Sequence, residues 1–61
     1  MMRLYEVAVR SEKTGLPLTR YLVRGSCAAG VAWWAERRMR REFRGQKPYV
    51  QTVSFQGTID R

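Results

Sequence analysis

The sequence predicts a small α+β domain in which one helix covers one face of a three-stranded antiparallel sheet, in the order strand, strand, helix, strand. Three observations predict this fold class. Three segments alternate apolar and polar residues with a period of two, and one longer segment repeats apolar residues with the period of a helix. Residues typical of turns separate these segments. The 61 residues suffice for one domain, which we expect to span residues 1–61.

The first two alternating segments, residues 4–10 and 18–24, are expected to form a β-hairpin. The loop between them contains Gly15 and Pro17, which are typical of turns. In each segment the side chains alternate between a face for the helix and a face that stays uncovered. The hairpin side chains expected under the helix are Tyr5, Val7, Val9, Tyr21 and Val23.

A helix is expected from about Cys27 to Arg44. At about 100° per residue, six apolar residues of this segment fall within one arc that would cover the sheet. They are Ala28, Val31, Ala32, Ala35, Met39 and Phe43. Ser26 is the expected N-cap, and Gly45 is expected to take the left-handed conformation that ends the helix. Pro48 would prevent the helix from resuming.

The last alternating segment, residues 49–56, is the expected third strand, followed by a short tail at 57–61. Val53 and Phe55 would lie under the helix. The helix is long enough to carry the chain across to the free edge of the first strand, so that strand is expected in the middle of the sheet. The residues expected on the uncovered face are Arg10, Arg20, Leu22, Arg24, Val50 and Thr52.

The net charge is +7, from 12 lysines and arginines against five acids. Such a balance attracts polyanions, so nucleic acid, an acidic protein surface and an anionic membrane surface are the partner classes to consider. No stretch approaches the roughly 20 apolar residues of a transmembrane helix, and the apolar stripe of the helix is needed to cover the sheet, so we expect no membrane partner. No signal peptide is visible and a lone cysteine fits a reducing compartment, which predicts a cytoplasmic location.

Catalytic chemistry is not indicated by the residues present. The chain has no histidine, its five acids are scattered, and it contains no phosphate-binding glycine loop or serine elbow. Cys27 is the one candidate nucleophile and has no accompanying base, so we expect a structural role for it. These absences predict a non-enzymatic protein with no metal and no cofactor.

The segment from Trp33 to Lys47 is the strongest indication of function. At helical spacing, Trp33 falls on the same side as Arg37 and Arg44, away from the apolar stripe. An exposed aromatic ring beside arginines can stack a base while the arginines neutralise phosphates. We therefore predict nucleic-acid binding, to DNA rather than RNA. The candidate residues are Trp33, Arg37, Arg38, Arg40, Arg41, Arg44 and Lys47.

A protein interface is the alternative prediction. Trp33 and its arginines could instead form local cation–π pairs, remain solvated, or contact a second copy in a homodimer. The uncovered sheet face mixes arginines with aliphatic residues, which suits docking on a protein partner. The candidate residues for this interface are Arg20, Leu22, Arg24, Val50 and Trp34. Such a module would meet an acidic surface and inhibit or modulate a host protein machine, for example RNA polymerase or a defence complex.

The order of elements and the size resemble those of small phage proteins that inhibit a host machine such as RNA polymerase. The resemblance is architectural, covers most of the chain and involves no shared motif, so it assigns no residue a role. It implies an interaction with a protein partner. The arginine-rich composition and the absence of catalytic groups also fit a gene of a phage or another mobile element.

Overall fold

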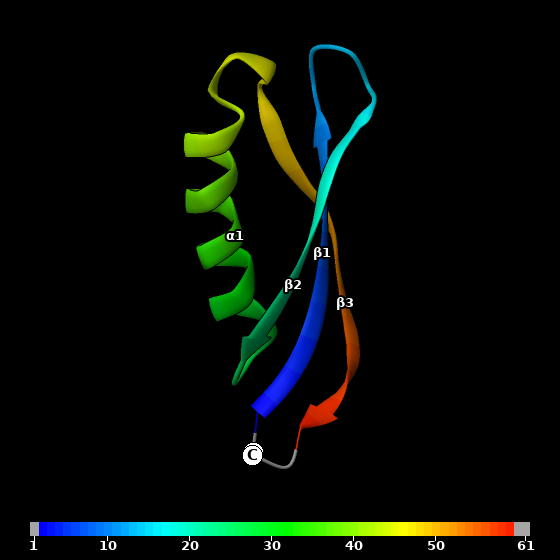
Figure 1. The fold of residues 1–61 in the computed structure, drawn as a ribbon, viewed down its shortest axis with the longest axis vertical. Coiled ribbons are helices and arrows are strands. Elements are labelled where there is room, and N and C mark those ends of the chain that lie inside the picture. Colours follow the sequence, from blue (N-terminus) through cyan, green and yellow to red (C-terminus); the bar gives the residue numbers. More distant parts are fainter. Residues whose placement is uncertain (1, 60–61) are drawn as a thin grey trace.

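The structure is a computed structural model that describes residues 2–59. Its elements are β1 (Met2–Ser11), β2 (Pro17–Gly25), α1 (Ala28–Glu42), the short 3-10 helix η1 (Arg44–Gln46) and β3 (Pro48–Ile59). The strands form one sheet in the order β2-β1-β3, with antiparallel pairing on both sides of β1 (Figure 1). The predicted fold class is therefore confirmed, including the position of the first strand in the middle.

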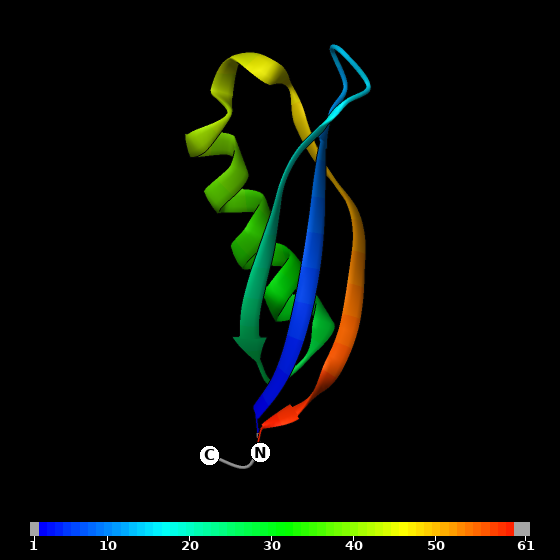
Figure 2. The same ribbon diagram turned by 45° about the vertical axis from the view of Figure 1, so that its right-hand side comes forward.

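The hydrophobic core lies between α1 and the sheet face that the helix covers. Its buried members alternate along β1 and recur every fourth residue along α1, as the two backbone periods require. They are Tyr5, Val7, Val9, Val31, Ala35 and Met39. Partly buried side chains complete it: Leu18, Tyr21, Val23, Phe43, Val50 and Val53. Figure 2 shows the helix on one side of the sheet, so among the described residues the other face has no covering element.

Strand β3 shifts its register against β1, which moves one predicted site residue. Ala8 lies opposite Thr52, and Val9 lies opposite Val50. Gln51 is therefore an extra residue in a β-bulge. Val50 therefore faces the helix and packs against the core, and its expected place on the uncovered face is wrong. A strict period of two cannot reveal such a bulge, because one extra residue turns every earlier side chain to the opposite face.

Strand β3 also runs further than the sequence predicts. A second register shift lies near Gly57, whose φ of +148° is readily adopted only by glycine. The strand continues through this shift to Ile59, so the expected tail at 57–61 is wrong as far as the structure describes it. Phe55, expected under the helix, packs its ring edge-on against Tyr5 but remains 57% exposed.

Both ends of α1 differ from the prediction. Cys27 and not Ser26 is the N-cap, and no side chain caps the first turn with a hydrogen bond. Ala28 is exposed and does not join the apolar stripe. At the other end, only Phe43 separates α1 from η1, and the left-handed residue that reverses the chain is Lys47 (φ 50°, ψ 64°) and not Gly45. The tight turn of η1 delays the reversal by two residues.

Ser11 ties together two loops at the end of the molecule where α1 finishes. Its fully buried Oγ donates a hydrogen bond to the carbonyl oxygen of Gln46 at 2.6 Å. The same Oγ accepts bonds from the backbone N–H groups of Lys13 and Thr14, at 3.1 and 3.2 Å. The hairpin loop is thereby fixed to the connection between α1 and β3, which anchors the arginine-bearing end of the helix against the sheet.

Candidate nucleic-acid interface

Trp33 lies on the outward side of α1, where its helical spacing places it. The side chain is 63% exposed, because the helix turns its apolar stripe towards the sheet and the indole away from it. One turn later, the guanidinium carbon of Arg37 lies 4.8 Å from the centre of the indole ring, which is a cation–π contact. Most of the indole surface is nevertheless in contact with solvent.

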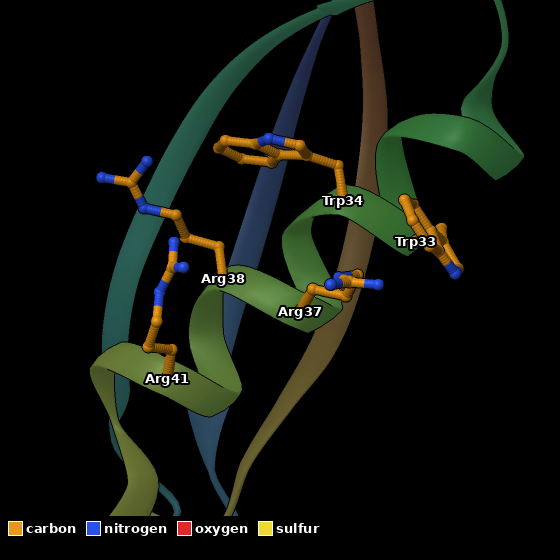
Figure 3. A pocket seen from close by; sticks show the side chains of 5 residues that line it. All are labelled: Trp33, Trp34, Arg37, Arg38 and Arg41. Atoms are coloured by element: carbon orange, nitrogen blue, oxygen red, sulfur yellow. The ribbon is translucent and has the colours of Figure 1, made fainter.

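Trp34 lies where α1 borders the edge strand β2. Its ring packs edge-on against Tyr21 of that strand, with ring centres 5.6 Å apart and an angle of 83° between the planes. The guanidinium carbon of Arg38 lies 5.6 Å from the indole centre. Figure 3 shows Trp34 above Arg38 and Arg41, with Trp33 pointing away from it. Strand and helix together therefore hold Trp34, and 39% of it remains exposed.

Glu42 fixes the arginine that lies beside Trp34. Its carboxylate accepts one hydrogen bond from the phenol of Tyr21 at 2.5 Å and one from Nε of Arg38 at 3.0 Å. Partial burial, the hydrogen bond to Glu42 and that negative charge raise the pKa of Tyr21 to about 12. The hydrogen bonds from Tyr21 and Arg38 lower the pKa of Glu42. The carboxylate thus stays charged and keeps Arg38 under the indole.

The two tryptophans and three arginines surround a depression that we call the cationic hollow. Its volume is about 280 Å³, and Figure 3 shows its lining side chains. The lining residues are Trp33, Trp34, Arg37, Arg38 and Arg41. Within residues 2–59, neither Arg37 nor Arg41 is engaged in an ion pair. Two cations without an acidic partner in this range, beside two aromatic rings, can bind a planar or anionic ligand.

The remaining predicted nucleic-acid residues lie outside the cationic hollow. Arg40 donates a hydrogen bond from a terminal guanidinium nitrogen to Glu36 at 2.7 Å, an ion pair along the helix. Arg44 is exposed in η1. Lys47 lies at the hairpin-loop end of the molecule, in a separate depression that Lys13 also lines. The structure therefore brings together four of the seven predicted residues and adds Trp34 to them.

The predicted protein interface is also only partly gathered on one surface. Arg20, Leu22 and Arg24 are exposed on the uncovered side of β2, and Leu22 is 68% exposed. Arg20 lies 3.8 Å from a carboxylate oxygen of Glu6 on β1, an exposed pair of small energetic value. Val50 lies against the core, and Trp34 lines the cationic hollow.

Tyr21 and Glu42 were missed by sequence reasoning as supports of this hollow. Tyr21 was expected only as a core residue, and the hydrogen bond between it and Glu42 joins residues 21 positions apart. No local pattern reveals such a contact. Trp34, in contrast, precedes Arg38 by four residues, a spacing that does place two side chains together on a helix.

Among residues 2–59, no group of three or more histidines, cysteines or acids could hold a metal ion. No helix in this range is long and apolar enough to cross a membrane. No family model, no curated protein and no solved structure matches this chain. The geometry of the cationic hollow is therefore the basis for a functional proposal.

Proposed function

We propose that this chain is a small basic nucleic-acid-binding protein that acts in an accessory or regulatory role through the cationic hollow. The observation that carries the proposal is the exposure of Trp33 against Arg37, in a hollow that Arg41 also lines. Neither arginine has an acidic partner within residues 2–59. Arginine binds phosphate through charge-assisted hydrogen bonds, and an aromatic ring stacks on a base.

The charge distribution supports the same proposal. Twelve lysines and arginines stand against five acids, which leaves the net charge of +7. Two of the three ion pairs within residues 2–59 lie along α1 itself. Those two pairs, Arg38–Glu42 and Arg40–Glu36, orient their own arginines. They leave Arg37 and Arg41 without an acidic partner within residues 2–59. A polyanion would gain attraction from the whole surface and specific contacts from Arg37 and Arg41.

Salt-dependent titration with single-stranded and duplex oligonucleotides tests this proposal. If four phosphates are contacted, affinity should fall roughly a hundredfold between about 50 and 200 mM salt. Arg41→Gln should reduce the slope of log affinity against log salt by about 0.7–0.9, the value for one lost phosphate contact. Arg20→Gln is the matched control, because it removes the same charge from the uncovered sheet face.

Two results would contradict the proposal. If neither oligonucleotide binds at about 50 mM salt, nucleic acid is excluded as the partner. An equal effect of Arg41→Gln and Arg20→Gln would mean that net charge alone attracts the oligonucleotide, without a specific site.

A protein-interaction module is the second candidate function, and one observation favours it. Leu22 is 68% exposed between Arg20 and Arg24 on the uncovered face, an apolar side chain framed by cations. Such a surface suits an acidic protein partner with an apolar centre. Affinity capture from host extract with wild type and Leu22→Glu tests this candidate. Capture of the same proteins by both variants would argue against it.

A further inference from the structure

A second depression lies on the other side of the two tryptophans, and we call it the N-terminal hollow because the first turns of α1 border it. Its volume is about 340 Å³, at the lower end of the roughly 300–1,000 Å³ typical of small-molecule sites. Its lining includes Arg24, Ser26, Cys27, Gly30, Trp33 and Trp34. The indoles therefore form a wall shared with the cationic hollow.

Gly30 keeps the N-terminal hollow open, and packing does not require a glycine at this position. A Cβ added there would meet only Sγ of Cys27, at 3.7 Å, which is an ordinary van der Waals contact. The backbone conformation is helical, with no positive φ, so an L-residue fits without strain. Alanine is also the better helix former. A larger side chain at position 30 would project into the hollow beside the indoles.

We propose that the N-terminal hollow receives an unpaired base of a single strand of nucleic acid, while the adjacent phosphates lie on the cationic hollow. This inference rests on the proposed function and names its ligand class. Stacking on Trp33 or Trp34 requires access to the face of a base. A duplex offers only base edges in its grooves, whereas an unpaired strand can turn its bases outward.

The spacing along α1 fits a strand that crosses the two hollows. Trp33, Arg37 and Arg41 succeed one another at four-residue intervals, a rise of about 6 Å each along the helix axis. Arg37 lies against the indole of Trp33, and Arg41 lies below Trp34 (Figure 3). A strand with a base in the N-terminal hollow would therefore meet these two cations where it passes the indoles into the cationic hollow. Arg24, at the end of β2, also lines the N-terminal hollow.

An abasic strand provides the direct test. A thymidine strand of about 12 nucleotides, within the usual site sizes of single-strand binders, is compared with a strand of equal length that lacks most of its bases. At about 50 mM salt, we expect the intact strand to bind wild type about tenfold or more tightly than the abasic strand, the effect of losing stacking. A duplex of equal length should also bind more weakly than the intact strand.

Three variants assign the base to the N-terminal hollow. Gly30→Leu should bring the ratio of intact to abasic affinity close to one, and Gly30→Ala, the matched control, should preserve it. Trp33→Leu should abolish the same ratio without filling the hollow, which keeps the test valid if Gly30→Leu does not fold. In Trp34→Phe, Trp33 is the one remaining indole, and the intact strand should quench its fluorescence whereas the abasic strand should not.

The outcomes separate the two proposals. Equal binding of intact and abasic strands, each weakened by salt, would overturn the base site and leave the proposed function standing. A base preference that survives both Gly30→Leu and Trp33→Leu would also overturn the site. Absence of binding by every oligonucleotide at 50 mM salt would overturn the proposed function itself, and the inference with it.

Discussion

The exposure of Trp33 follows from one angular relation in the helix. Side chains two positions apart in the sequence point about 200° apart on an α-helix. Burying Val31 against the sheet therefore turns Trp33 into solvent. This could be predicted from the sequence, because the backbone fixes the helical period. The contacts of Glu42 could be predicted only in part. Arg38 lies one helical turn before Glu42, but Tyr21, the second hydrogen-bond donor to Glu42, belongs to another element.

Ser11 gives a prediction about stability at the residue scale. Ser11→Ala removes the one side-chain oxygen that serves the N–H groups of Lys13 and Thr14 and leaves the carbonyl of Gln46 without its donor. We expect the free energy of unfolding to fall by about 1–3 kcal/mol, the effect of unsatisfied buried polar groups. Urea denaturation measures it. The exposed Ser54→Ala is the control and should change stability by less than about 0.5 kcal/mol.

Strand β3 shows what the elements add beyond residue patterns. Its alternation predicted a strand, and the strand exists, but two register shifts against β1 decide which side chains face the helix. Val50 therefore moved from the predicted interface to the core. A bulge depends on the pairing with the neighbouring strand and on the curvature that the helix requires, and neither is encoded in a local period.

Gly25 allows α1 to approach the end of β2, and this gives a prediction at the element scale. A Cβ at this position would lie 2.6 Å from Cγ2 of Val31, so Gly25→Ala forces the helix away from the strand. We expect a loss of about 1–3 kcal/mol in unfolding free energy, as for other overpacked sites. Val31→Ala removes the clashing methyl group but leaves a poorly filled core, so the double variant should regain little or no unfolding free energy over Gly25→Ala. The effects of the two substitutions should nevertheless be clearly non-additive.

Chemical denaturation of the four proteins in this double-mutant cycle gives the measurement. Gly45→Ala is the control, because a Cβ there meets nothing within 4 Å. Strict additivity of Gly25→Ala and Val31→Ala would contradict a direct contact between the two positions.

Tyr21 links strand and helix through Glu42 and predicts a dependence of stability on pH. Its pKa is raised from 10.0 to about 12 in the folded protein, so the unfolded chain loses this proton first. The stability that the protonated Tyr21 contributes is therefore fully present below pH 10 and is lost as pH rises from about 10 to 12. Glu42 has the opposite sign: its lowered pKa gives stability above about 4.5 that is lost as the pH falls.

Thermal or urea unfolding across this alkaline range tests the link. The difference in stability between wild type and Tyr21→Phe should shrink as pH rises from 10 to 12. Tyr49→Phe provides the comparison, because Tyr49 lies on β3 and forms no bond to Glu42 among the described residues. A constant difference between wild type and Tyr21→Phe would contradict the hydrogen bond seen here.

At the scale of the whole molecule, the sequence predicted the layers correctly. Four segments with clear periods gave the strand order, the covered face and the outward helix stripe. The site was predicted less completely, because its parts depend on contacts between elements. Trp34 joins the cationic hollow through its packing on β2, and Lys47 lies apart from the hollow because η1 carries the chain to the hairpin-loop end.

Mapping the contact surface by nuclear magnetic resonance tests most directly whether nucleic acid binds on the outward side of α1. Isotope-labelled protein is titrated with the thymidine strand at about 50 mM salt. We expect the largest shifts at the indole N–H signals of Trp33 and Trp34 and at the amides of Arg37 and Arg41, with Leu22 unchanged. Shifts centred on Leu22 and the uncovered sheet face, or no shifts at all, would contradict the account.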